Sequence, residues 1–261
     1  MKKGLNCRMS KNIGIDLGTS NVIVYAKGKG IVLREPSVVA AETRGGKVVA
    51  VGNEAKMMLG KTPGSIKAVH PLKDGVIAEF DFAAKMLRDM FSRVSGNALF
   101  SRPKVMISIP YGVTEVEKRA VEDVTLEAGA QSVALIEEPF AAAIVQCGSS
   151  ACAAALGAGL PVSEPTASMV ADIGGGTTEV AVISLGGIVL SNSIKIAGDT
   201  FDESIAAYIK NNFHVLIGDV TAEELKKNLG SALEATDRGA MEIRGRNLQN
   251  GLPAILTVNS A

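Results

Sequence analysis

A glycine-rich run near the middle of the chain, DIGGGTTEV at residues 172–180, most constrains its fold. An apolar stretch at residues 168–171 precedes it and an alternating stretch at residues 179–184 follows, so the pattern predicts a β-hairpin with glycines at its corner. Such glycines permit backbone conformations closed to other residues. Successive amides aimed at one point bind anions, and a carboxylate at the strand end can hold hydrated Mg²⁺ beside the anion. The run therefore predicts a polyphosphate site, although an ordinary glycine-rich hairpin has the same pattern.

The same pattern occurs a second time, near the start of the chain. Residues 13–21, IGIDLGTSN, place Asp16 at the end of an apolar stretch, before a turn of glycine and hydroxyl residues and an alternating strand at residues 22–26. Two such hairpins could face each other across one phosphate chain. We expect Asp16 and Asp172 to hold Mg²⁺ through water, and the two corners to bind phosphate through Gly18, Thr19, Ser20, Asn21, Gly174, Gly175, Gly176 and Thr177.

Composition narrows the class of protein. A chain of 261 residues with 47% hydrophobic content can bury one large core or two modest ones. Lys plus Arg and Asp plus Glu both number 27, and no basic stripe is interleaved with aromatics, so we expect no nucleic-acid partner. The three cysteines have neither an even count nor zinc spacing, which favours reduced thiols in a cytoplasmic protein.

Two segments raise the question of a secretory signal or a membrane span. Residues 1–11 are basic and lack an apolar centre, so they do not resemble a secretory signal. The charge-free segment at residues 140–163 is long enough to raise the question of a span, but Gln146, Pro161 and several glycines interrupt it. We expect no transmembrane segment there.

Periodicity predicts the other elements. Apolar positions at helical spacing indicate a helix at residues 83–94, and a shorter helix is expected at residues 53–59. Three Thr-x-x-Glu pairs predict helix starts by a capping box, at Thr114, Thr200 and Thr221. Apolar runs predict strands at residues 31–34, 37–41, 48–51, 104–109, 133–136, 188–193, 241–247 and 254–258, with Pro36 separating the first two.

Further segments point to a family. The two hairpins, with EEPFAAA at residues 137–143 between them, resemble the actin, sugar-kinase and DnaK-type chaperone superfamily. Within it, the chain resembles the MreB family of bacterial actin homologues from about residue 12 to residue 258. That resemblance rests on GKGIVLREPSVVA at residues 28–40, KDGVIA at 73–78, VTEVEKRA at 113–120 and GGTTEVAVISLG at 175–186.

The resemblance implies an α/β, actin-like (ribonuclease H-like) duplicated fold with the nucleotide in the interdomain cleft. We expect an N-terminal extension at residues 1–11, domain I at residues 12–156 with a small outer subdomain at about residues 35–66, and domain II at residues 157–261, incomplete at its C-terminus. Compared with the family, residues 145–156 are an insertion, which we expect to form a surface loop because a helix lengthened by that much would disturb its neighbours.

The resemblance also implies site residues beyond the hairpins. A predicted strand delivers Glu137 and Glu138 to its carboxyl end, where open α/β sheets bind ligands. Such a pair could be a solvated edge, but the resemblance places Glu138 where the family positions the water that attacks the terminal phosphate; Glu137 stays unassigned. The family brings Gly198 close to the nucleotide and lays a helix along the adenosine, with contacts from Glu223, Glu224, Leu225 and Lys226. A solvated, charged first turn fits that helix equally well.

An apolar pair lies in a predicted loop. Leu99 and Phe100 precede Arg102, and large apolar groups in a loop are either tucked into the core or exposed for contact. In MreB proteins a loop at this position inserts an apolar pair into the membrane, so the resemblance favours insertion over a core plug. Two such residues hold one subunit weakly, but many subunits in one filament hold firmly.

Together these features predict a structural protein. It would bind ATP and Mg²⁺, polymerise into filaments with copies of itself at the inner face of the cytoplasmic membrane, and govern rod shape together with cell-wall elongation proteins. ATP hydrolysis would be slow and coupled to assembly. The alternatives within the superfamily are a small-molecule kinase, for which no acceptor-binding insertion or general-base aspartate is visible, and a chaperone nucleotide domain, which needs a substrate-binding domain after it.

Overall fold

The computed structural model describes residues 12–95, 102–137, 164–185, 187–233 and 238–260. The chain forms two compact units, Met1–Lys195 and Ile196–Ala261, and each is described by itself. The expected domain boundary at residues 156/157 falls in a segment outside the described residues and stays a prediction.

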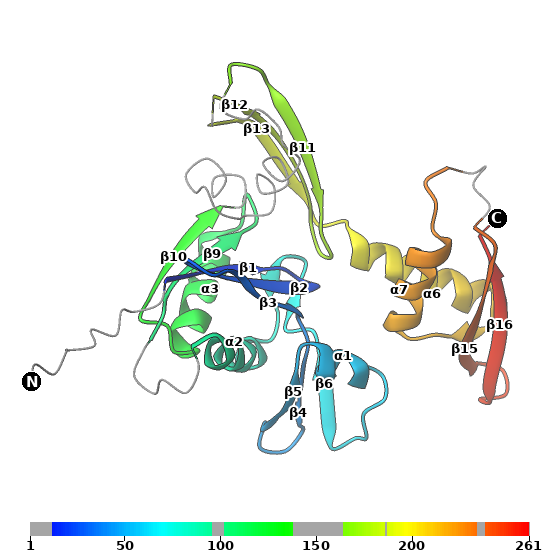
Figure 1. The fold of residues 1–261 in the computed structure, drawn as a ribbon. Helices are drawn as coiled ribbons and strands as arrows, with labels where there is room; N and C mark the ends of the chain where they lie inside the picture. Colours follow the sequence, from blue (N-terminus) through cyan, green and yellow to red (C-terminus); the bar gives the residue numbers. More distant parts are fainter. Residues whose placement is uncertain (1–11, 96–101, 138–163, 186, 234–237, 261) are drawn as a thin grey trace, which may run out of the picture. The chain divides into compact units, whose positions relative to one another are not determined.

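The first unit is built on a five-stranded mixed sheet. Its order is β10 (Ser132–Glu137), β9 (Lys104–Ile109), β1 (Asn12–Leu17), β2 (Asn21–Ala26) and β3 (Gly30–Pro36). Strands β10, β9 and β1 run parallel, whereas β1, β2 and β3 form antiparallel hairpins. Two helices, α2 (Phe80–Ser95) and α3 (Glu115–Glu127), pack beside each other against one face of this sheet (Figure 1).

Alternation explains why this face is the core. Ile13, Ile15 and Leu17 of β1 are buried while the residues between them are partly exposed, and β2 repeats the pattern. The helical positions predicted from periodicity close the other side, where Ala83, Leu87 and Met90 are each fully buried. The sheet therefore presents its other face, which carries Asp16, away from the helices.

A small second sheet follows β3. Strands β5 (Val48–Val51), β4 (Val39–Glu42) and β6 (Ile66–Val69) pair in that order, and α1 (Asn53–Met58) packs on them around a core of Val38, Ala40, Ala50 and Ala55. Pro36 does not separate two strands as predicted: it ends β3, where the missing amide costs no ladder hydrogen bond.

A tight two-stranded turn follows the small sheet. Strands β7 (Leu72–Lys73) and β8 (Val76–Ile77) flank Asp74 at φ 52° and Gly75 at φ 77°. Positive φ at both central residues is the geometry of a type I′ turn, for which Asp-Gly is a favoured pair.

The remaining sheet of the first unit is antiparallel and contains the second glycine-rich corner. It comprises β11 (Ser168–Ile173), β12 (Thr178–Ser184) and β13 (Gly187–Ile194). Val170, Ala181 and Ile183 are buried on one face. The opposite face exposes large apolar side chains: Met169 (69% exposed), Ile173 (63%), Leu190 (67%) and Ile194 (48%).

The second unit has its own core. Helices α6 (Gly198–Phe213) and α7 (Asp219–Leu229) pack against the sheet β14 (Val215–Leu216), β15 (Ala240–Asn247) and β16 (Pro253–Asn259). Ile209, Leu225, Leu229 and Ile243 are buried between them. No helix in the described part of the chain is long and apolar enough to cross a membrane.

One of the three predicted capping boxes is confirmed. At α3 the Glu117 amide donates to Thr114 Oγ1 at 3.3 Å, and the Thr114 amide donates to the Glu117 carboxylate at 2.7 Å. The other two predictions are wrong because both helices begin earlier. Helix α6 starts at Gly198, so the hydroxyl of Thr200 accepts from the Ala197 amide. Helix α7 is capped by Gly218, whose carbonyl accepts from the Thr221 amide.

Candidate functional site

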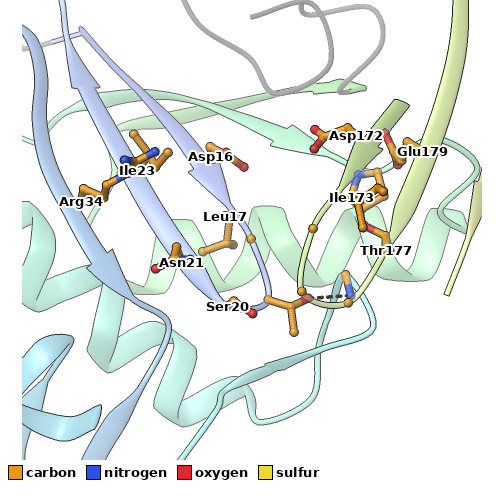
Figure 2. A pocket seen from close by; sticks show the side chains of 17 residues that line it. Asp16, Leu17, Ser20, Asn21, Ile23, Arg34, Asp172, Ile173, Thr177 and Glu179 are labelled. Atoms are coloured by element: carbon orange, nitrogen blue, oxygen red, sulfur yellow. Dashed lines mark hydrogen bonds between the residues drawn. The ribbon is translucent and has the colours of Figure 1, made fainter. Parts of the chain in front are cut away.

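A cavity of about 630 Å³ lies between the two glycine-rich corners of the first unit. Figure 2 shows it from close by. It is lined by residues 16–21 with Ile23 and Arg34 on one side, by residues 172–177 with Glu179 on the other, and by Gly75 and Pro110. This volume lies within the range of about 300–1,000 Å³ typical of small-ligand pockets.

Both corners are hairpins, as predicted. In the first, Asp16 of β1 pairs with Ile23 of β2; in the second, Asp172 of β11 pairs with Glu179 of β12. Asp16 and Asp172 lie on facing sides of the cavity, one from each hairpin (Figure 2). All ten hairpin residues predicted to bind phosphate or metal line this cavity: Asp16, Gly18, Thr19, Ser20, Asn21, Asp172, Gly174, Gly175, Gly176 and Thr177.

Three distant parts of the chain meet at the floor of the cavity. The Gly75 amide donates to Thr19 Oγ1 at 2.9 Å, and Thr19 is 7% exposed (Figure 2). Gly176 approaches the same point: a Cβ there would lie 2.9 Å from the Gly75 nitrogen and would also clash with Thr19 Oγ1. The Asp74–Gly75 turn thus fixes the spacing of the two hairpins.

The glycines of the corners are required for a reason other than the predicted one. None of Gly18, Gly174 and Gly176 has a φ in the left-handed region, so conformational freedom is not what selects them. Glycine is required there because a Cβ has no room. A Cβ on Gly18 would lie 2.8 Å from the Asn21 carbonyl oxygen, and a Cβ on Gly176 would clash with the neighbouring turn.

The cavity is acidic. Ser108 Oγ donates to Asp16 Oδ1 at 3.4 Å, and the Tyr111 amide donates to Glu179 Oε1 at 3.1 Å. Glu179 is 2% exposed. Burial raises the pKa of Asp172 above its usual value.

This donor set fits Mg²⁺. The ion binds through one or two carboxylates and keeps several waters and phosphate oxygens, and a nearby cation would offset the desolvation of Asp172. Asp16 and Asp172 would hold it. Within the described residues no cluster of three or more His, Cys, Asp or Glu is arranged as an all-protein metal site.

Seven lining residues were not predicted: Leu17, Ile23, Arg34, Gly75, Pro110, Ile173 and Glu179. The Lys-Asp-Gly-Val sequence at residues 73–76 is a hairpin-turn signal that could have located Gly75 as a turn, but not beside Thr19. Glu179 could have been found from the predicted pairing of the second hairpin, which places it opposite Asp172. Arg34 depends on the pairing of β2 with β3, which residue patterns do not fix.

The other predicted nucleotide contacts lie in the second unit. Lys226 Nζ donates to the Gly198 carbonyl at 2.7 Å and lies 2.8 Å from Asp202 Oδ2, which ties α7 to the first turn of α6. Glu223 pairs with Lys227, Leu225 is 3% exposed in the core, and Glu224 is exposed. Burial raises the pKa of Asp202, although Lys226 acts in the opposite direction. Their roles toward a nucleotide stay predictions.

Three predicted functional residues lie outside the described residues: Glu138, Leu99 and Phe100. The same holds for the insertion at residues 145–156 and for residues 1–11.

Comparisons with known proteins agree on one family. The family model described as MreB/Mbl protein matches residues 10–261. The chain is 50% identical to the cell shape-determining protein MreB of Escherichia coli over 265 residues, covering 100% of this chain and 73% of that protein. It is 47% identical to the cell shape-determining protein Mbl of Bacillus subtilis, covering 96% of this chain and 72% of that protein.

Solved structures give the same result. MreB5 of Spiroplasma citri is 40% identical and superposes with a TM-score of 0.82, covering 97% of this chain and 72% of that chain. Its crystal structures are described as bound to ADP and to AMPPNP.

Proposed function

The chain belongs to the MreB/Mbl family of actin-like cytoskeletal proteins, and from that premise we propose that it binds ATP with Mg²⁺ and assembles into filaments at the inner face of the cytoplasmic membrane. Self-assembly and nucleotide binding carry over from the family. The cell-wall elongation proteins are proposed partners on the same ground.

One observation carries the nucleotide part of the proposal: two similar hairpins place an aspartate each on one cavity of about 630 Å³. The backbone amides of their corners are donors for phosphate oxygens, and Thr19 and Thr177 add hydroxyls. Solved relatives bound to ADP and AMPPNP support ATP as the ligand.

Hydrolysis is proposed to be slow and to act as a timer for assembly. Mg²⁺ held through Asp16 and Asp172 would supply charge neutralisation to the phosphates. The chain's own residues bind and orient: the corners fix the phosphate chain, and Glu138 would position the attacking water and accept its proton late in the reaction.

The kinase and chaperone alternatives are not favoured. Identity of 50% with a cell shape-determining protein covers the whole of this chain, so the likeness is not confined to the shared nucleotide-binding fold.

Sedimentation tests the proposal. The protein is centrifuged at high speed with MgATP, with MgADP and without nucleotide, beside Asp16→Ala, which removes a pocket carboxylate. We expect the wild type to pellet with MgATP, and Asp16→Ala to remain in the supernatant. Equal pelleting of both proteins in all three conditions would remove ATP-driven assembly from the account.

A vesicle arm of the same experiment tests membrane attachment. Vesicles of phosphatidylethanolamine and phosphatidylglycerol are floated with the protein and MgATP. Leu99→Ser combined with Phe100→Ser should abolish flotation while leaving filament pelleting unchanged, because insertion of the apolar pair contributes the membrane affinity. Unchanged flotation would assign the pair to packing.

A further inference from the structure

Arg34 is a cation on an acidic cavity. Of the described residues that line the cavity, three carry carboxylates, Asp16, Asp172 and Glu179, and Arg34 alone carries a basic side chain. Its position in β3 is the exposed face of an outer strand, where an arginine ordinarily has no more than a solvating role.

Strand register places Arg34 in line with the first aspartate. Asp16 of β1 pairs with Ile23 of β2, and Ile23 pairs with Arg34 of β3. The three residues form a row across one face of the sheet, opposite the helices, and Figure 2 shows all three beside the cavity. Neighbouring strands are about 4.8 Å apart, so the Cα atoms of Arg34 and Asp16 are separated by two strand spacings, about 10 Å. A long side chain on this row flanks a ligand held at Asp16.

Among the described residues, the guanidinium of Arg34 has no partner. Its neighbour Glu35 accepts from Arg93 at 3.2 Å and from the side chain of Asn53 at 2.8 Å. Arg34 itself forms no side-chain hydrogen bond or ion pair with another described residue, although carboxylates line the same cavity. Five donors in a planar fork thus remain available to a ligand.

We propose that Arg34 is a phosphate-binding residue of the cavity, contacting the phosphate chain of the bound nucleotide. An anionic phosphate chain beside three carboxylates is repelled by them, and Mg²⁺ offsets only part of that charge. The guanidinium of Arg34 supplies positive charge to the cavity and pairs with phosphate oxygens in a bidentate geometry. This inference rests on the proposed nucleotide binding and adds to it a residue that neither corner contains.

A charge series at one position tests it. Arg34→Lys, Arg34→Gln and Arg34→Glu are compared with wild type for binding of MgATP and MgADP by fluorescent-nucleotide competition at low and high salt. A charge-assisted hydrogen bond predicts about tenfold weaker binding for Arg34→Gln and a larger loss for Arg34→Glu. Arg34→Lys should lose less than Arg34→Gln, because it keeps the charge but not the bidentate fork. The loss should shrink at high salt, since this exposed cation is screened.

Arg44 provides the matched control, because it is exposed on the turn between β4 and β5 and does not line the cavity. Arg44→Gln and Arg44→Glu should bind like wild type, and melting curves without nucleotide should be equal for all variants. Wild-type affinity in Arg34→Glu, or equal losses in the Lys, Gln and Glu variants, would overturn the assignment. Absence of binding by the wild type would instead refute the proposed function.

Discussion

At the residue scale, the site shows what local patterns can and cannot reveal. Each corner can be recognised from nine consecutive residues, because its aspartate, glycines and hydroxyl residues lie together in the sequence. Arg34, Glu179 and Gly75 reach the same cavity through strand pairing and a long-range contact, so no local pattern marks them. Residue types therefore predicted the two glycine-rich corners that line the cavity and missed the other lining residues.

Asp172 combines a proposed function with a cost in stability. Burial raises its pKa, so without a bound cation the folded protein favours the protonated carboxyl. The sign follows from linkage: the stabilising contribution is complete below the ordinary pKa of 3.8 and is lost as the pH rises through the higher folded value. At neutral pH the ionised carboxylate therefore destabilises the nucleotide-free protein.

Asp172→Asn should consequently raise the melting temperature of the nucleotide-free protein at pH 7 by about 2 °C, because the amide carries no charge to desolvate. The difference should disappear below about pH 3.8. The same variant should bind MgATP at least about tenfold more weakly. Differential scanning fluorimetry across pH and a binding titration check both. A variant less stable than wild type at neutral pH would contradict the expectation.

At the element scale, strands and long helices were predicted well and helix starts poorly. Alternation and helical spacing located the strands of the main sheet and α2, since burial of one face imposes those periods. The Thr200 and Thr221 boxes failed because Ala197 and Gly218 adopt extended backbone and end the preceding segment sooner. The residues before a helix help decide where it begins, and a four-residue pattern does not include them.

The confirmed box at Thr114 predicts a measurable loss. Thr114→Ala removes the hydroxyl that accepts from the Glu117 amide and should lower the free energy of unfolding by about 1 kcal/mol. The hydrogen bond from the Thr114 amide is the main cause that lowers the pKa of Glu117. Its contribution to the stability of the folded protein is therefore present above pH 4.5 and is lost as the pH falls through the lower pKa of the folded state. Urea unfolding at pH 7 measures the loss.

Thr221→Ala is the matched control. Thr221 has the same sequence signature but lies inside the first turn of α7, where Gly218 is the cap. Its substitution should cost clearly less than that of Thr114. Equal losses would mean that the hydroxyl of Thr114 acts through something other than capping.

At the scale of the whole molecule, each of the two units has buried residues of its own, which implies two partly independent folding units. The main core of the first unit surrounds its five-stranded sheet, and the core of the second lies between α6, α7 and β15. The cavity is lined by described residues of the first unit alone, whereas Gly198, Glu223 and Lys226 belong to the second. Hydrogen exchange can therefore separate the contributions of the two units to nucleotide binding.

We expect MgATP to slow amide exchange in peptides covering residues 16–21 and 172–177, where the corners would donate to phosphate, and in peptides covering α7, where the family resemblance places the adenosine. Peptides from β5 and α1 are the internal control and should not change. Protection of both corners without any change in α7 would leave Lys226 with the role it has in the structure, holding α7 to α6.

The meeting of Thr19, Gly75 and Gly176 has a consequence for how the molecule is made. These three positions are widely separated along the chain. Bringing them together closes long loops, and this costs conformational entropy before the contact stabilises the protein. During synthesis the first hairpin leaves the ribosome long before its counterpart exists. The cavity lined by both corners therefore cannot form until translation has passed the second one.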